Sequence, residues 1–310
     1  MSLPRSPPVA FFAAILTTCA LLTATAFAQN FDKVEVKTEK LSSGIYVLYG
    51  AGGNVGLSIG EDTVFLIDDQ YAPLTPKIVA AIKALTDKPV QFVLNTHWHG
   101  DHTGGNENFR KAGALIIAHD NVRKRLSSEQ FLAHINRKIP ASPEAALPVL
   151  TFSSDMTFHI NGDEVYVFHM ANAHTDGDAI IHFRKSNVIH MGDTMWNNIY
   201  PIIDSLAGGT PDGMIAAADR VLRLSDDKTK IIPGHGPLAG KADLKAYRDM
   251  LAAIGGRVKA LVKEGKKLDE VIAAKPTVDF DERWGKGFFS STRFTEMLFS
   301  AYSAPGASAK

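Results

Sequence analysis

After its first thirty residues, the chain alternates short hydrophobic runs with glycine-containing turns. Each run has the length and composition of a β-strand. The predicted strands span residues 34–38, 45–49, 55–59 and 63–67. Residues 73–85 then predict a helix, because their apolar side chains recur at helical spacing and fall on one side. The pattern therefore begins with several short strands and continues into a helix.

Strands and helices alternate through the rest of the chain. Further buried strands are predicted at residues 90–94, 115–118, 165–169, 179–183, 188–191 and 230–232. Helices are predicted at residues 210–224, 244–263 and 269–274, and residues 292–302 close the predicted domain. Residues 121–148 are expected to be irregular, partly helical and interrupted by prolines, and to be able to form a wall over a site. No low-complexity linker divides the chain, so the pattern favours one α/β domain.

The segment that follows the predicted strand at 90–94 concentrates metal-binding side chains. His97 and His99 are two residues apart in an extended loop, so both can point toward one ion. Asp101 and His102 are offset from them and can bind a second ion beside it. Imidazoles combined with a carboxylate form a mixed ligand set that suits zinc. The alternative is a histidine-rich surface loop that binds no metal.

Three more candidate ligands follow the same pattern further along the chain. His174, Asp193 and His235 each follow or lie beside a predicted strand, next to glycine or another turn former. A rigid strand that ends in a ligand loop is a suitable support for a preorganised metal site. The repetition of this arrangement argues against the metal-free alternative.

Four motifs follow one another along the chain: H-x-H-x-D-H, a lone histidine, Gly-Asp and Pro-Gly-His. In these motifs and their order, nearly the whole chain resembles the metallo-β-lactamase superfamily. The resemblance implies the αββα four-layer sandwich of that family and two Zn²⁺ ions per chain. It assigns His97, His99 and His174 to one zinc ion, Asp101, His102 and His235 to the other, and Asp193 to a bridge between them.

The resemblance also implies a mechanism, in which a hydroxide shared by the two zinc ions attacks a carbonyl group. Asp101 would orient this hydroxide or transfer its proton. Asp68 resembles an early aspartate of the family that supports a metal-bound imidazole, and a simple turn residue is the alternative. The loop from Asn197 to Tyr200 either borders the substrate or is an ordinary turn, and Trp98 either packs under its loop or faces the substrate.

The remaining histidines match no position of the motifs, and we expect structural roles for them. They are His119, His134, His159, His169, His182 and His190.

Residues 1–28 are predicted to be a signal peptide, because an apolar run ends at Ala26-Phe27-Ala28. Residues 29–310 would then be a single hydrolase domain in the periplasm or outside the cell. A retained membrane anchor and a lipoprotein attached through Cys19 are the alternatives. Cys19 is the only cysteine, so the mature chain has no thiolate ligand. This departs from the best-known zinc β-lactamases, whereas Asp193 resembles the glyoxalase II and lactonase pattern.

The charge of the mature chain is nearly balanced. Removing Arg5 with the signal peptide leaves 33 − 1 = 32 basic residues against 33 acidic ones. Such a balance gives no electrostatic reason to expect nucleic acid or an anionic membrane as a partner. A small-molecule substrate is expected instead, and the sequence leaves the oligomeric state open.

Several activities remain open within this interpretation. The leading one is hydrolysis of a carbonyl compound by two zinc ions, with a β-lactam ring amide as the first candidate. A lactone, a thioester and a small phosphodiester are the alternative substrates. Redox chemistry at two iron ions is disfavoured because the flavodiiron relatives carry Glu where this chain has His99. A non-catalytic zinc-binding protein is the last alternative.

Overall fold

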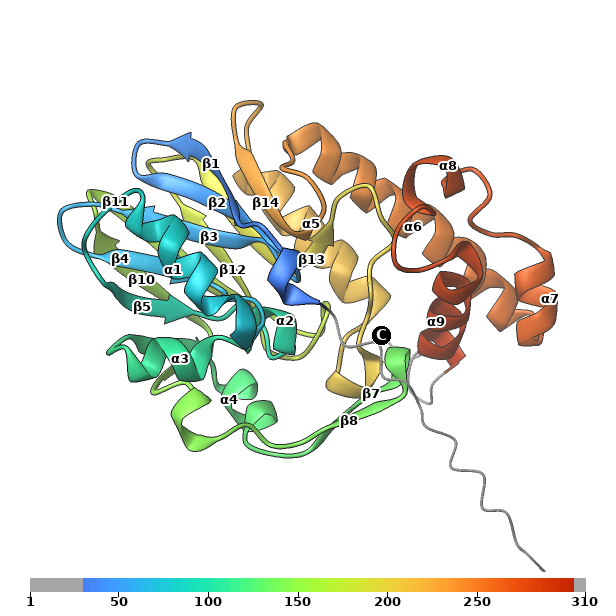
Figure 1. Ribbon diagram of the computed structural model, residues 1–310. Helices are drawn as coiled ribbons and strands as arrows, with labels where there is room; N and C mark the ends of the chain where they lie inside the picture. The colour runs from blue at the N-terminus through green and yellow to red at the C-terminus, as the bar shows by residue number, and fades with distance from the viewer. Residues whose placement is uncertain (1–29, 304–310) are drawn as a thin grey trace, which may run out of the picture. The chain divides into compact units, whose positions relative to one another are not determined.

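Two mixed β-sheets lie face to face, and helices cover their outer faces (Figure 1). This arrangement is seen in a computed structural model that describes residues 30–303, so the predicted signal peptide lies outside the described residues. The described residues from Phe31 onward belong to one compact unit. The prediction of an α/β fold with four layers is confirmed. Among residues 30–303, no helix combines the length and apolar character needed to cross a membrane.

The first sheet has seven strands in the order β1-β2-β3-β4-β5-β6-β9. Its strands are β1 (Lys37–Ser42), β2 (Ile45–Tyr49), β3 (Val55–Ile59), β4 (Val64–Ile67), β5 (Val90–Leu94), β6 (Leu115–His119) and β9 (Leu150–Phe152). Strands β1 to β4 pair antiparallel, whereas β4, β5, β6 and β9 pair parallel. The parallel strands bring their carboxyl ends to one edge of the sheet.

The second sheet has five strands in the order β10-β11-β12-β13-β14. Its strands are β10 (Asp155–Ile160), β11 (Asp163–Met170), β12 (Asp178–Phe183), β13 (Val188–Trp196) and β14 (Lys230–His235). Only β13 and β14 pair parallel. A separate hairpin, β7 (Gln130–Leu132) and β8 (Arg137–Ile139), lies within the segment that was expected to be irregular.

The helices cover the sheets on both sides. They are α1 (Thr75–Lys83), α2 (Gly100–Thr103), α3 (Asn106–Lys111), α4 (Asp120–Leu126), α5 (Pro211–Leu224), α6 (Lys241–Lys263), α7 (Leu268–Ala273), α8 (Asp281–Trp284) and α9 (Ser291–Ser303). Helix α5 is capped by Thr210, whose side chain accepts a hydrogen bond from the Gly213 N–H, and Pro211 occupies its first position.

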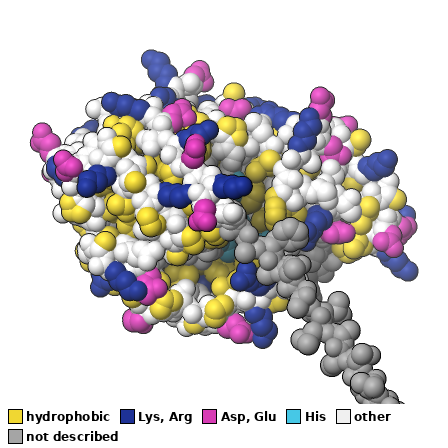
Figure 2. Space-filling model, viewed as in Figure 1, with side chains coloured by type: hydrophobic (Ala, Val, Ile, Leu, Met, Phe, Trp, Pro, Cys, Tyr) yellow, Lys and Arg dark blue, Asp and Glu magenta, His cyan; other side chains and the backbone are white. Residues whose placement is uncertain are grey.

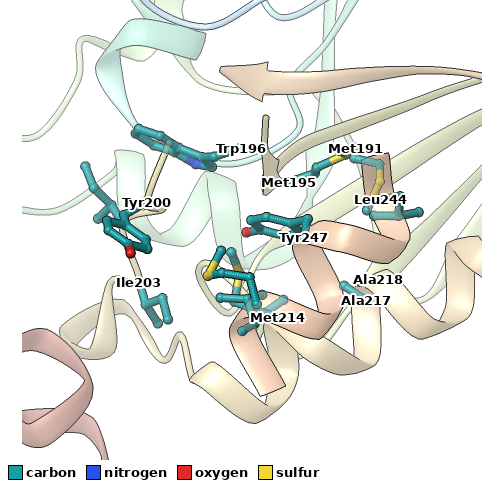
Figure 3. Packing of buried hydrophobic residues seen from close by; sticks show 14 of the residues in the cluster. Met191, Met195, Trp196, Tyr200, Ile203, Met214, Ala217, Ala218, Leu244 and Tyr247 are labelled. Atoms are coloured by element: carbon teal, nitrogen blue, oxygen red, sulfur yellow. The ribbon is translucent and has the colours of Figure 1, made fainter. Parts of the chain in front are cut away.

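Three hydrophobic cores correspond to the three interfaces between the four layers. Phe65 and Ile67 from the first sheet meet Val167 and Ile181 from the second in the central core. A second core packs the first sheet against α1 and α3. The third packs the second sheet against α5, α6 and α9, and its members near β13 include Met191, Met195, Trp196, Met214, Leu244 and Tyr247 (Figure 3). Strand β13 is therefore held firmly on both faces, and all nine of its residues are buried.

Candidate metal centre

All seven side chains that the sequence predicted as metal ligands lie together at the carboxyl ends of the strands. They form two groups, within each of which one ligand atom per residue lies within 4.8 Å of the others. The first group contains His97, His99, His174 and Asp193, and the second contains Asp101, His102 and His235. These are two sets of histidine and carboxylate donors that could hold two metal ions.

Asp193 joins the two groups through its two carboxylate oxygens. Its Oδ2 lies 3.8 Å from His97 Nε2 and 3.5 Å from His174 Nε2. Its Oδ1 lies 3.1 Å from His102 Nε2 and 3.4 Å from His235 Nε2. One oxygen therefore faces each group, as the bridging position implied by the resemblance requires. Gly234 allows this approach, since a Cβ at that position would lie 2.0 Å from Asp193 Oδ1.

Asp68 holds the ligand loop from the end of β4. Its Oδ1 accepts a hydrogen bond from the Thr96 N–H at 2.7 Å, and its Oδ2 accepts one from the Thr96 hydroxyl at 2.8 Å. The same Oδ2 lies 2.7 Å from His102 Nδ1. Asp68 is completely buried and has a left-handed backbone with a φ of 61°. It therefore supports an imidazole of the second group, and the simple turn alternative does not describe it.

These contacts determine which nitrogen of two histidines carries a proton. A carboxylate only accepts hydrogen bonds, so His102 donates its Nδ1 proton to Asp68 and turns Nε2 toward the site. The Thr96 hydroxyl has given its only proton to Asp68, so its 3.0 Å contact with His97 Nδ1 requires a proton on that nitrogen. The lone pair of His97 is therefore on Nε2, which is buried and has no hydrogen-bond partner among residues 30–303.

The same reasoning applies to the other two imidazoles of the first group. His99 donates from Nε2 to the Asp204 carboxylate at 3.0 Å, and His174 donates from Nδ1 to the Ile202 carbonyl at 2.9 Å. In the neutral rings that bind a metal, the remaining nitrogens, His99 Nδ1 and His174 Nε2, carry lone pairs, and they face each other at 2.9 Å. Two buried lone pairs at this distance repel each other, and a cation between the donors would remove the repulsion. The residues therefore fit a bound metal ion.

The electrostatic character of the two groups differs. Burial lowers the pKa of His97 well below its usual value and that of His174 to about 4, so both are neutral donors at pH 7. Burial opposes protonation of His235 as well, but Asp193 and Asp101 outweigh it and raise its pKa to about 9. The second group thus binds protons tightly in the absence of metal. A divalent cation would replace those protons and meet the same negative field.

The second group is also the accessible side of the centre. The Asp101 and His235 side chains are 22% and 17% exposed, whereas those of His97, His174 and Asp193 are 3% exposed or less. The space-filling view shows a hollow on this face, in whose depth histidine side chains are visible between hydrophobic ones (Figure 2). A small molecule would therefore reach the centre from the side of Asp101.

The structure answers the question that the sequence left open for Trp98. The indole is buried and packs with Leu132, Leu147 and Ala207 beneath the ligand loop. The packing alternative therefore holds, and Trp98 supports the loop.

The loop from Asn197 to Tyr200 was expected either to border the substrate or to be an ordinary turn, and the contacts of Asn197 and Tyr200 are structural. Asn197 is buried and donates to the carbonyl of Pro237, while Tyr200 stacks on Phe294 with ring centroids 4.6 Å apart. Tyr200 also donates to Asp281. Tyr200 thereby ties the loop to the C-terminal helices α8 and α9.

Three contributors to the centre carried no recognisable signal in the sequence. Thr96 connects Asp68 to His97, and Asp204 binds His99, as described above. His134, at the tip of the β7–β8 hairpin, places its ring 6.1 Å from that of His99, and its carbonyl accepts a hydrogen bond from Arg293. Neither Asp204 nor His134 is near the ligand motifs along the chain, so only the fold reveals them.

Comparisons with known proteins agree with this geometry. The chain is 28% identical over 157 residues to a hydroxyacylglutathione hydrolase of Pelagibacter ubique, a match that spans 50% of this chain and 56% of that relative. It is 26% identical over 185 residues to a metallo-beta-lactamase type 2 of Elizabethkingia meningoseptica, spanning 57% of this chain and 68% of the relative.

Solved structures share the fold at lower identity. A metallo-beta-lactamase from Pontibacter korlensis superimposes with a TM-score of 0.57 at 20% identity, covering 70% of this chain and 99% of that one. The DIM-1 metallo-beta-lactamase gives a TM-score of 0.56 at 20% identity, covering 71% and 98%. The sequence profile of the metallo-beta-lactamase superfamily matches residues 48–235, which is more than half of the chain and includes all seven clustered side chains. The protein therefore belongs to the metallo-beta-lactamase superfamily.

Proposed function

We propose that the protein is an exported hydrolase that uses two zinc ions to cleave a carbonyl compound, with a β-lactam ring amide as its first candidate substrate. The observation that carries this proposal is the convergence of histidine ring nitrogens from both groups on the two oxygens of Asp193. Mixed imidazole and carboxylate donors without a thiolate suit zinc. The chemistry that two zinc ions supply is hydroxide near neutral pH and polarisation of a carbonyl oxygen.

Asp101 is the residue that we assign to proton transfer. Its Oδ2 lies 3.3 Å from His235 Nε2 and 3.6 Å from His102 Nε2. Burial would raise the pKa of Asp101, but the neighbouring histidines outweigh it and hold the pKa well below the usual range. Asp101 thus remains a carboxylate at neutral pH. On the accessible side of the centre, it can accept a proton from the attacking water and pass it to the leaving group.

The substrate class is the finer part of the proposal. The relatives that support a β-lactam are the metallo-beta-lactamases, to which the chain is similar in sequence and fold. A specific observation favours an ester or thioester as the second candidate. The bridging position is held by Asp193 rather than by a cysteine, and the hydroxyacylglutathione hydrolase is among the relatives in sequence.

The test is hydrolysis by the purified mature protein, measured with zinc and again after chelation. A chromogenic cephalosporin, an aliphatic lactone, an S-acyl glutathione and a bis-aryl phosphodiester would be compared under identical conditions. Chelator-sensitive turnover of the cephalosporin is the expected result. Turnover of the lactone or thioester alone would retain the hydrolase and replace the substrate. Zinc binding without any turnover would favour the non-catalytic alternative.

A matched pair of variants tests the role of Asp101. Asp101→Ala is expected to lower kcat by at least ~100-fold, the usual contribution of a proton-transfer group. Asp87→Ala, at an exposed aspartate before the amino end of β5 and thus at the opposite end of this strand from the ligand loop, should leave kcat unchanged. Equal activity of the two variants would refute the assignment. Cell fractionation tests the proposed export. The expected result is that the protein is found in the periplasmic or extracellular fraction.

A further inference from the structure

Besides Asp68, a second buried carboxylate at the metal centre belongs to neither ligand group. Asp204 immediately precedes η5 (Ser205–Ala207), and its side chain is 3% exposed. Its Oδ2 accepts a hydrogen bond from His99 Nε2 at 3.0 Å across a separation of 105 residues. The Coulomb energy of this buried contact is much less screened by water than that of a surface pair. Asp204 is therefore in a position to influence His99 strongly.

The segment of Asp204 also contacts a second imidazole of the same group. The Asp204 N–H donates to the His174 carbonyl at 3.0 Å, and the Ile202 carbonyl accepts the Nδ1 proton of His174 at 2.9 Å. Asp204 Oδ1 in turn accepts from the Ala207 N–H at 3.1 Å, which fixes the carboxylate itself. Three residues of one segment thus orient both His99 and His174.

The contact with Asp204 decides how His99 can bind a metal. A neutral imidazole carries its proton on either nitrogen, and the hydrogen-bond partner selects which. Because the carboxylate holds the proton on Nε2, the lone pair of His99 lies on Nδ1, which is the nitrogen that faces His174. With the opposite tautomer, a proton would occupy the metal-facing position.

We propose that Asp204 is a positioning residue for the first metal site, which selects the Nδ1-binding tautomer of His99. This inference rests on the proposed zinc binding and deepens it. It implies that Asp204 increases the affinity of the site formed by His97, His99 and His174, while the site of Asp101, His102 and His235 does not depend on it.

Zinc titration of full-length mature variants against a chromophoric chelator tests this proposal. Asp204→Ala should weaken one of the two zinc sites by roughly 10- to 100-fold, as is usual for loss of a carboxylate behind a metal-bound histidine. Asp204→Asn, which removes the charge at constant size, should give a smaller loss. The matched control is Asp163→Asn, because Asp163 is also a buried aspartate that accepts backbone hydrogen bonds but lies outside both groups.

A spectroscopic readout separates the positioning role from a merely structural one. Long-range proton–nitrogen NMR of histidine-labelled, metal-free protein reports which ring nitrogen of His99 carries the proton. The expected result is an Nε2 proton in the unaltered protein and a mixture of tautomers in Asp204→Ala. If Asp204→Ala does not fold, the same comparison is made with Asp204→Leu, which is close to Asp in size and has no acceptor.

Three results would overturn the proposal: an unchanged tautomer, zinc affinities within twofold of the unaltered protein, or equal weakening of both sites. Failure of the proposed function looks different, since the unaltered protein would then bind no zinc at all.

Discussion

The hydroxyl of Thr96 provides a sharp test of the reasoning about histidine tautomers. Thr96→Val replaces the hydroxyl by a methyl group at a buried position and keeps the branched shape of the side chain. Two hydrogen bonds disappear: the one donated to Asp68 at 2.8 Å and the one accepted from His97 Nδ1 at 3.0 Å. The first is a hydrogen bond to a charged group, and the loss of the second leaves a buried donor unpaired.

The expected magnitude follows from these two contacts. A hydrogen bond to a charged group contributes about 1.5–3 kcal/mol, and an unpaired buried donor costs about 1–3 kcal/mol. Asp68 retains its bonds to the Thr96 N–H and to His102, which offsets part of the first loss. We therefore expect Thr96→Val to lower the free energy of unfolding of the metal-free protein by about 3 kcal/mol. Zinc affinity should fall by roughly 10-fold or more, because Nδ1 of His97 no longer has a partner for its proton.

The assay is urea unfolding in the presence of a chelator, combined with zinc titration. Thr96→Ser keeps the hydroxyl and loses only a buried methyl group, which costs about 1 kcal/mol. Thr103→Val removes a hydroxyl from α2, which directly follows His99; this hydroxyl donates only to the backbone carbonyls of Trp98 and His99. Both controls should retain zinc affinity. A Thr96→Val protein that binds zinc as tightly as Thr96→Ser would refute the assignment of the His97 tautomer.

Three further predictions follow from the same geometry. Gly53→Ala should displace His102 and weaken the second zinc site at least ~10-fold, because a Cβ at position 53 would lie 2.1 Å from the imidazole. Gly100→Ala is the control, because a Cβ at position 100 would have no atom within 4 Å. Zinc titration of both variants measures the difference. Neighbouring carboxylates raise the pKa of His235 to about 9 and that of His102 well above its usual value, so zinc must displace protons from the second group at pH 7. The apparent zinc affinity should therefore rise by at least about tenfold per pH unit up to about pH 9; a constant affinity in titrations at several pH values would contradict this. His134→Ala should raise KM without changing the zinc content, because the His134 ring lies beside the His99 ring but belongs to neither donor group. Steady-state kinetics and metal analysis test this, and a loss of zinc from the variant would contradict it.

The sequence predicted most of the sheet strands, and its errors have a physical explanation. The strand expected at residues 34–38 is in fact β1 at Lys37–Ser42. Val34 and Val36 resemble strand residues but pack against the core beside α1, whereas β1 is an exposed edge strand with only one buried residue. Strand β10 was not predicted for a similar reason, since it pairs with β11 alone and alternates between exposed and half-buried positions. A single hydrophobic run therefore indicates burial more reliably than it indicates the hydrogen bonds of a sheet.

The sequence by itself determined the donors of the candidate metal centre. The ligands lie in short motifs at or near the ends of buried strands of both sheets, and the packing of the two sheets brings these ends together. Only the tertiary structure decided which nitrogen of each imidazole faces the centre. That choice depends on a hydrogen-bond partner from a distant segment: Asp68 for His102, and Asp204 for His99. Because a neutral imidazole has two nearly equivalent tautomers, its chemistry is undetermined until the fold supplies that partner.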